Sequence, residues 1–191
     1  MNYFIYLSLL TIFIILLNKY FIKFNFLVSE TGDRHQKFAS DEIVPLTGGI
    51  FLFLSFLYFF NYEILSFFIF SFLIFILGIF SDLKDIESAF KRFLIQISIV
   101  LMFVIFNDLL LFNTKIYLLD KLLSYSVFNY IFVSFCILIV INGSNFFDGL
   151  NTLSIGYYLL ISFVIFYLNY NQIILVNEIF TEYLLVVLLI I

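Results

Sequence analysis

The sequence has few of the residues that usually build metal or redox sites. Its 191 residues include one cysteine, Cys136, one histidine, His35, one proline and no tryptophan. A single cysteine excludes an internal disulfide, and a single histidine excludes a histidine-rich metal site. A divalent ion would therefore be held by carboxylates, amides and phosphates, which are ligands that suit magnesium better than zinc.

Charge is scarce as well. Only 12% of the residues are charged, whereas 64% are hydrophobic and 30 are phenylalanine. A water-soluble domain cannot bury so much apolar surface, so we expect lipid to solvate most of the chain. The net charge of −4 and the lack of a basic block argue against nucleic acid as a partner. The sequence thus predicts a single integral membrane domain over residues 1–191.

Apolar segments of nearly membrane-spanning length recur along the chain. Lipid offers no partners for unpaired backbone groups, so these segments should be helices. We predict an all-α, polytopic transmembrane helix bundle of about six full spans plus a truncated seventh. The spans are expected at about 3–22, 44–61, 64–80, 93–107, 126–141 and 153–169, with the seventh beginning near 178. Since the last apolar run is too short to cross a bilayer, we expect a fragment of a longer protein.

Lysine and arginine residues fall mainly in alternate loops. The first, third and fifth loops contain Lys23, Arg34, Lys37, Lys84, Lys91 and Arg92, whereas the other loops contain Lys115 and Lys121. Positive residues are retained in the cytoplasm. We therefore predict that the odd-numbered loops are cytoplasmic and that the N-terminus lies outside. Three loops with unusual polar residues then share one side of the membrane.

The first polar cluster precedes and opens the second predicted span. It contains Arg34, His35, Lys37, Thr47, Gly48 and Gly49. Pro45 suits an early helical position, and the two glycines permit close approach of a ligand. A helix N-terminus beside cations suits an anion. The alternative is a charged loop whose glycines serve helix packing, and the sequence leaves both open.

The second cluster follows the third predicted span. Asp82 and Asp85 are three residues apart, which places them on neighbouring faces of a continuing helix. Carboxylates so close to an apolar segment are costly unless they hold a cation or each other. The alternative is a helix that simply ends in solvent, with Lys84, Lys91 and Arg92 as partners.

The third cluster, VINGSNFFDGLN, ends the fifth predicted span. Asn142, Asn145 and Asp148 recur every three residues, so on a helix they share an arc of about 120°. Gly143 allows a close backbone approach. Amide side chains form hydrogen bonds with hydroxyls and base edges, and a carboxylate accepts hydrogen bonds or approaches a metal. The alternative is an asparagine-rich cap followed by a turn.

Together the three clusters resemble the polyprenyl-phosphate N-acetylhexosamine-1-phosphate transferases, that is, glycosyl transferase family 4. The resemblance rests on RHQK…VPLTGG, GIFSDLKD with the downstream FKRFLIQ, and NGSNFFDGLN, and covers about residues 28–155. It implies transfer of a sugar-1-phosphate from a UDP-sugar to a polyprenyl phosphate such as undecaprenyl phosphate. UMP is released, and Mg²⁺ or Mn²⁺ assists. The implied setting is the bacterial inner membrane, at the start of cell-wall or lipopolysaccharide synthesis.

The resemblance also implies residue roles. Asp82, Asp85 and Asp148 would be catalytic, and Asp82 and Asp148 would approach the metal. The residues expected to bind substrate are Arg34, His35, Lys37, Thr47, Gly48, Gly49, Asn142, Asn145 and Asn151.

The sequence departs from the family pattern at two places. The family usually has two adjacent aspartates in the second cluster, and here Ser81 replaces the first of them. The usual segment DGLDGL is DGLNTL in this chain, with Asn151 and Thr152 in place of an aspartate and a glycine. The family's later cytoplasmic motifs lie beyond the residues given. We therefore expect the 191-residue chain to be inactive alone. The alternative functions are a small membrane transporter, whose polar residues would lie near the bilayer centre, and a non-catalytic assembly subunit.

Overall fold

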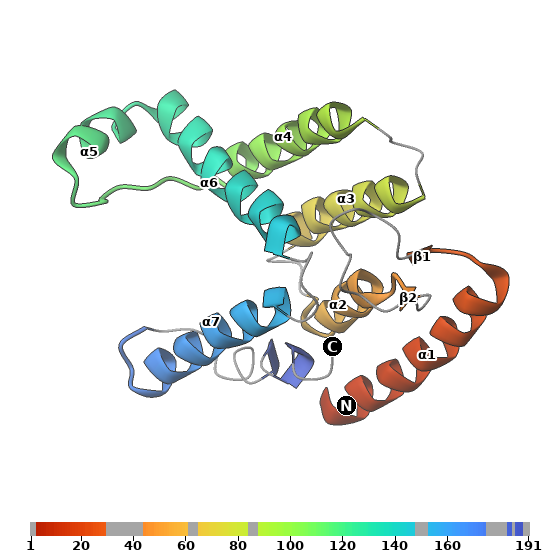
Figure 1. The fold of residues 1–191 in the computed structure, drawn as a ribbon. Helices are drawn as coiled ribbons and strands as arrows, with labels where there is room; N and C mark the ends of the chain where they lie inside the picture. The colour runs from red at the N-terminus through yellow and green to blue at the C-terminus, as the bar shows by residue number, and fades with distance from the viewer. Residues whose placement is uncertain are drawn as a thin grey trace. The chain divides into compact units, whose positions relative to one another are not determined.

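The computed structural model describes residues 3–29, 44–60, 65–83, 88–147, 153–174, 183–184 and 186–188. It divides into two compact units (Figure 1). Unit 1 comprises Met1–Phe59 and Phe147–Ile191, and unit 2 comprises Phe60–Phe146. Each unit is described by itself, and the prediction of one membrane domain over residues 1–191 stays a prediction.

Unit 1 begins with α1, Tyr3–Phe24, a helix whose length suits a membrane span. The helix ends where Asn25 takes a positive φ of 51° and the Phe26 amide donates to the Phe21 carbonyl. A short antiparallel pair follows, β1, Val28–Ser29, with β2, Val44–Pro45. The pair brings the chain back beside the end of α1, and the Leu46 amide extends it by donating to the Leu27 carbonyl at 2.8 Å.

The prediction that Pro45 takes an early helical position is wrong. Pro45 pairs with Val28 in the strand, and α2, Gly48–Phe56, begins three residues later. Proline lacks an N–H and disfavours helical dihedrals in the residue before it, so the edge of a short strand accommodates it well. A 3₁₀ turn, η1, Leu57–Phe59, ends the second apolar segment. The described helix is therefore shorter than the span expected over residues 44–61.

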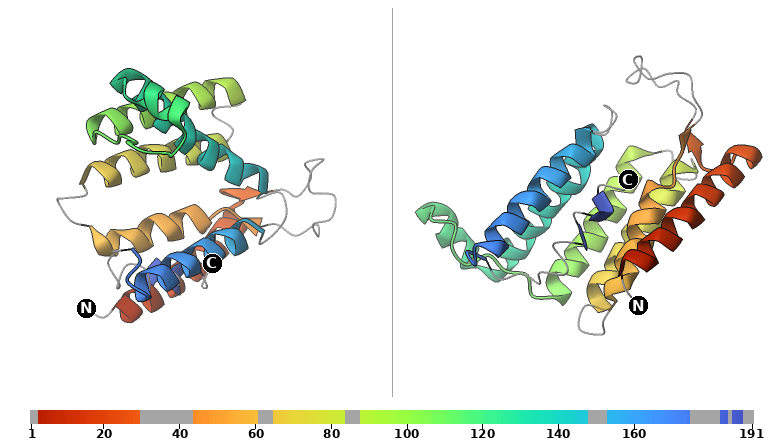
Figure 2. Two further views of the ribbon diagram at one scale, coloured as in Figure 1. Left: turned by 90° about the vertical axis from the view of Figure 1, so that its left-hand side faces the viewer. Right: turned by 90° about the horizontal axis from the view of Figure 1, so that it is seen from below.

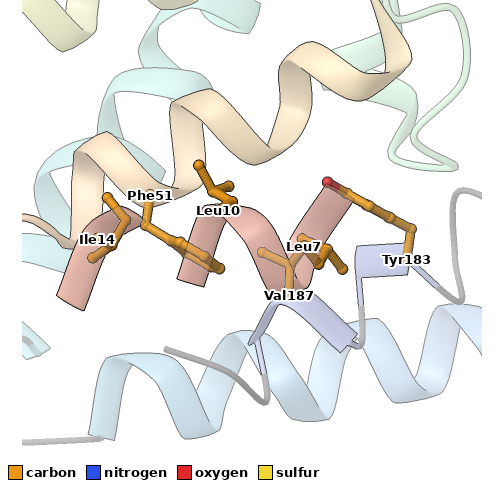
Figure 3. Packing of buried hydrophobic residues seen from close by; sticks show 6 residues of the cluster. All are labelled: Leu7, Leu10, Ile14, Phe51, Tyr183 and Val187. Carbon is orange, nitrogen blue, oxygen red and sulfur yellow. The ribbon is translucent and has the colours of Figure 1, made fainter. Parts of the chain in front are cut away.

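The core of unit 1 joins α1 to α2 and to the helical residues 183–184 and 186–188. Figure 3 shows Leu7, Leu10 and Ile14 on α1 beside Phe51 of α2, with Tyr183 and Val187 on the other side. The three α1 residues lie three or four positions apart, so they form one stripe of the helix. Unit 1 also contains α7, Leu153–Tyr170.

Two tyrosine hydroxyls satisfy backbone carbonyls near the end of α2. Tyr6 donates to the Leu54 carbonyl, and Tyr183 donates to the Ser55 carbonyl. Both carbonyls also accept from the Leu57 amide at the C-cap of the helix. The tyrosines therefore add a second donor at each carbonyl and tie the end of α2 to its neighbours.

Unit 2 contains α3, Leu65–Asp82, α4, Ala89–Phe106, α5, Tyr117–Leu123, and most of α6, Ser126–Phe147. Val100 and Val104 of α4 pack against Leu138 of α6, and Ile74 of α3 contacts the same cluster. In the left view of Figure 2, α3 and α6 run in one direction and α4 runs in the other. The ends of α3 and α6 therefore lie toward the same end of unit 2 as the start of α4.

The helices expose their apolar side chains instead of burying them. Among the described residues, four helices are long and apolar enough to span a membrane: α1, α3, α4 and α6. The buried share of the most apolar window of each is 11–22%. A shorter apolar helical stretch covers Ile155–Tyr170. Helices that are apolar on every side and largely exposed are suited to lipid. The predicted all-α transmembrane fold class is confirmed, and the chain is an integral membrane protein.

Candidate active site

Polar side chains gather where α3 ends and α4 begins. One guanidinium nitrogen of Arg92, Nη1, donates to the Ser81 hydroxyl at 2.9 Å. Asp82 is the last residue of α3, its side chain is exposed, and the positive charge of Arg92 acts on its carboxylate. Ser88 caps α4 by accepting from the Lys91 amide at 3.4 Å, which fixes where the helix begins. A hydroxyl, a carboxylate and a guanidinium thus meet at one end of the α3–α4 hairpin.

The same face of α4 carries a buried amide one turn further along. Gln96, Val100 and Val104 are spaced four residues apart and are buried, with Gln96 only 6% exposed. Arg92 extends this stripe by one turn toward the start of the helix. The Oε1 atom of Gln96 has no hydrogen-bond partner among the residues that the structure describes. A buried carbonyl without a partner is costly, so this oxygen is available to a donor near the site.

The NGSN segment is helical. α6 continues to Phe147, so Asn142 and Asn145 lie in the helix itself and do not form a cap and turn. The Asn142 side chain is half-buried, and its Nδ2 donates to the Leu138 carbonyl one turn earlier, at 3.0 Å. Because α6 runs in the direction of α3, the last turns of α6 in unit 2 lie toward the end of that unit where α3 ends (Figure 2). The side chain of Asn145 lies outside what the structure describes.

Unit 1 has its own polar pocket beside the start of α2. The pocket has a volume of about 350 Å³ and is lined by Thr11, Ile14, Ile15, Asn18, Pro45, Thr47, Gly48 and Phe51. Thr47, the N-cap residue, does not cap the helix with its side chain. Its hydroxyl instead donates to Asn18 Oδ1 at 2.6 Å, and Thr47 is only 4% exposed. The first backbone N–H groups of α2 are therefore not occupied by the N-cap side chain.

Two glycines in the predicted clusters have open space beside them. A Cβ atom at Gly48 or Gly143 would meet no atom within 4 Å among the described residues. At Gly48 this agrees with a surface that a ligand can approach. The close backbone approach expected at Gly143 is absent from the described part of unit 2.

The structure thus places the described candidates in two groups, one in each unit. Unit 2 brings Asp82 together with Ser81 and Arg92, and unit 1 places Thr47 and Gly48 at one pocket, with Gly49 next to it in α2. Asn142 and Asn145 lie in the last turns of α6. The other predicted residues lie outside the described part of the chain: Arg34, His35, Lys37, Asp85, Asp148 and Asn151.

Asp82 is the described carboxylate among the predicted metal ligands, and Ser81 is beside it. Among the described residues there is no group of three or more histidine, cysteine, aspartate or glutamate side chains close enough to hold an ion. Magnesium is often held by only one or two carboxylates together with substrate phosphates and water. The exposed carboxylate of Asp82 and the hydroxyl of Ser81 are oxygen donors of that kind, so the donor set fits Mg²⁺ and does not suit zinc.

Three residues near these groups were not among the predicted site residues. Arg92 and Gln96 lie on one face of α4, and Asn18 lines the pocket of unit 1. The available signal for the first two was a spacing of four residues between an arginine and a glutamine at the start of a predicted span. Nothing in the local sequence links Asn18 to Thr47, since 29 residues separate them.

Comparison with known proteins adds one match. The family model described as glycosyl transferase family 4 matches residues 64–191, more than half of the chain. The matched region includes the clusters at Asp82 and Asn142, and the cluster at Thr47 lies before it. No curated protein and no solved structure matches the chain.

Proposed function

Because this chain belongs to glycosyl transferase family 4, a family of phospho-sugar transferases, we propose that it transfers a sugar-1-phosphate from a UDP-sugar to a polyprenyl phosphate. We place the reaction at the cytoplasmic face of a bacterial inner membrane, where the donor is dissolved in water and the acceptor in lipid. The sugar is proposed to be of the N-acetylhexosamine type. The product would begin the synthesis of a cell-envelope polysaccharide or of peptidoglycan.

The proposed reaction is a single phosphoryl substitution. An oxygen of the polyprenyl phosphate attacks the β-phosphorus of the UDP-sugar, and the bond between that phosphorus and the bridging oxygen breaks. UMP leaves with the bridging oxygen, and a polyprenyl diphosphate sugar forms. Positioning and charge neutralisation dominate the catalysis of such reactions, so the site needs cations, hydrogen-bond donors and an edge where lipid meets water.

The end of the α3–α4 hairpin supplies these features. Arg92 places a guanidinium beside Ser81 and Asp82, and guanidinium groups bind phosphates through paired donors. In our proposal Arg92 binds a phosphate of the donor or the acceptor, and the bond to Ser81 holds its side chain toward the site. Asp82 receives no proton in this scheme and remains a carboxylate that orients the charged groups.

Magnesium, when bound, would neutralise negative charge on the two phosphates of the donor. Asp82 would hold it in part, with Asp148 as the second predicted ligand. Asp85, which lies between the two helices of the hairpin in the sequence, is proposed to act with them.

The amides and the pocket of unit 1 are proposed to recognise substrate. Asn142 and Asn145 lie in the last turns of α6, where amides suit the hydroxyl groups of a sugar or ribose. Thr47 and Gly48 lie at the start of α2, where N–H groups that the N-cap side chain does not occupy favour an anion. Arg34, His35, Lys37, Gly49 and Asn151 complete the set predicted to bind substrate.

The observation that carries this proposal is the grouping of Ser81, Asp82 and Arg92 at the end of an apolar hairpin inside the region matched to the family. The test is release of UMP from UDP-GlcNAc by membranes that contain the full-length gene product and undecaprenyl phosphate. We expect UMP release that requires both substrates and Mg²⁺.

A matched pair of variants makes this test specific. Asp82→Asn should remove the activity, whereas Asp108→Asn, the same change at the opposite end of the hairpin, should retain it. Activity without the lipid phosphate, or equal activity in both variants, would contradict the proposal.

A further inference from the structure

The connection between α4 and α6 is held by a buried amide of α6, and most of its large apolar side chains are exposed. Asn129, in the first turn of α6, is 2% exposed and bonds to the connection through both ends of its amide. Its Oδ1 accepts from the Leu111 amide at 3.0 Å, and its Nδ2 donates to the carbonyls of Leu111 and Leu123, each at 2.8 Å. One buried amide thus holds two separate points of the connection against α6.

Other polar groups of the connection are also paired within the protein. The Tyr130 hydroxyl donates to Asp108 at 2.6 Å, and the Asp120 carboxylate accepts from both the amide and the hydroxyl of Thr114 at 2.7 Å. These bonds give residues 108–125 a fixed shape. The shape therefore depends little on burying apolar side chains.

The apolar side chains of this connection are exposed. Tyr117 is 84% exposed and Phe112 is 82% exposed; the exposed set is Leu111, Phe112, Ile116, Tyr117, Leu118, Leu122 and Tyr125. On α5, Leu123 is buried against the unit, whereas Leu118 and Leu122 point away from it. A water-exposed loop would show the opposite arrangement, since exposed leucine and aromatic side chains in a group mark a contact surface.

The position of the connection indicates what covers this surface. α4 has 18 residues, about 27 Å of helix, which matches the hydrocarbon core of a bilayer. The connection begins where that helix ends. Its exposed apolar surface is continuous with lipid-facing residues of the two spans, Phe106 at the end of α4 and Val127 at the start of α6.

We propose that residues 108–125, with α5 at their centre, lie in the membrane interface and bind lipid at the boundary between headgroups and acyl chains. Aromatic side chains favour this level of a bilayer. The irregular backbone between Leu109 and Ile116 would lack partners deeper in lipid. Lys115 and Lys121 are exposed, so their ammonium groups reach lipid phosphates while their stems contact apolar surface. The lipid contact holds the end of the α3–α4 hairpin that lies opposite Asp82.

The chain has no tryptophan, so a single introduced tryptophan reports on its own surroundings. Phe112→Trp and Leu118→Trp place the probe on the connection. Phe135→Trp, nine residues into α6 and also exposed, is the matched control within the span. Each variant of the 191-residue chain is reconstituted into phosphatidylcholine vesicles whose acyl chains carry bromine at a shallow or a deep carbon.

We expect the two connection probes to be quenched most by shallow bromine and the control to be quenched most by deep bromine. Strong quenching by aqueous iodide without bromine quenching would show that the connection faces water and would overturn the proposal. Protection from both quenchers would show that a protein surface, a second copy or another partner, covers it. Strongest quenching by deep bromine would place the segment inside the hydrocarbon core, which also contradicts the proposal.

Discussion

The two ends of the α3–α4 hairpin are both closed by hydrogen bonds, but they differ in what they leave exposed. At one end Arg92 bonds to Ser81, and the neighbouring carboxylate of Asp82 remains exposed. At the other end Ser66 donates to Asn107, Asp108 accepts from Tyr130, and Asn129 holds Leu111. The first end leaves a charged group exposed, whereas the second uses its polar groups to fix structure.

The comparison separates two roles that composition alone cannot separate. Both ends are polar interruptions between apolar helices, and both contain an aspartate and an asparagine or serine. Polar groups that are paired within the protein mainly add specificity of structure, whereas charged groups left at a surface are candidates for binding. Substitutions at the first end should therefore change activity, and substitutions at the second should change stability.

The largest expected effect is that of Asp82→Asn. We expect the rate of sugar-phosphate transfer to fall by about 10²–10³-fold, which is typical for loss of an electrostatic group at a phosphoryl-transfer site. The melting temperature should stay nearly the same, because the side chain is exposed. Rates and melting curves of purified protein in detergent check both parts. A large drop in melting temperature would show that Asp82 mainly holds the structure.

Asn129→Ala should have the largest effect on stability. It removes three hydrogen bonds, one of them buried and two part-buried, to backbone groups of Leu111 and Leu123. We expect a loss of about 2–3 kcal/mol in the free energy of unfolding. Asn113→Ala, at an exposed asparagine of the same connection, is the control and should change little. If the two variants melt alike, the buried amide does not hold the connection.

Arg92→Ala should lower the rate by about 10–100-fold, since a charge-assisted hydrogen bond contributes about 1.5–3 kcal/mol. Arg92→Lys should recover only part of the rate, because lysine cannot bind a phosphate through a planar pair of donors. Lys91→Ala, at the adjacent exposed lysine, serves as the control for charge. Equal losses at positions 91 and 92 would point to general electrostatic attraction instead of a specific contact.

Gln96→Leu should separate function from stability on α4. The change removes a buried oxygen that lacks a partner among the described residues, so the free energy of unfolding should rise by about 1 kcal/mol. If a substrate group donates to this oxygen, the Michaelis constant should rise at the same time. A destabilised variant with unchanged kinetics would assign Gln96 to packing alone.

The smallest effect concerns pH and the opposite end of the hairpin. The hydrogen bonds from the Thr114 side chain and backbone lower the pKa of Asp120 below its ordinary value. The folded pKa therefore lies below the unfolded one, about 3.9. The stability that Asp120 contributes is present above the unfolded pKa and is lost as the pH falls through the folded pKa. Thermal unfolding at pH 7 and pH 3 should show that acid lowers the melting temperature of the wild type more than that of Asp120→Asn.

The sequence predicted the helical spans of this chain well where hydropathy alone determines them. The described bounds of α1, α3, α4, α6 and α7 lie within a few residues of the predicted spans, apart from extra turns at the start of α4 and the end of α6. The second segment was the exception. Its strand at Pro45 and its short helix depend on pairing with Val28 and on hydroxyl groups of Tyr6 and Tyr183, which are distant in sequence.

The candidate site was predictable only in part. Asp82 stood out because it follows an apolar helix directly, and the periodicity of Asn142 and Asn145 indicated a helical face. The bond between Ser81 and Arg92 was not predictable, because it depends on how the hairpin closes across 11 residues. The bonds from Asn129 to the connection were likewise not predictable, since a polar residue at the start of a span resembles an ordinary helix cap.

The central claim is that the acids and amides of α3, α4 and α6 face one side of the membrane and that the Asn129-anchored connection faces the other. The direct measurement is labelling with a membrane-impermeant thiol reagent in sealed vesicles of known orientation, with Cys136→Ser as background. Asp82→Cys and Asp148→Cys should be labelled from the cytoplasmic side, and Asn113→Cys from the opposite side only. Labelling of positions 82 and 148 from different sides, or of 82 and 113 from the same side, would contradict the account.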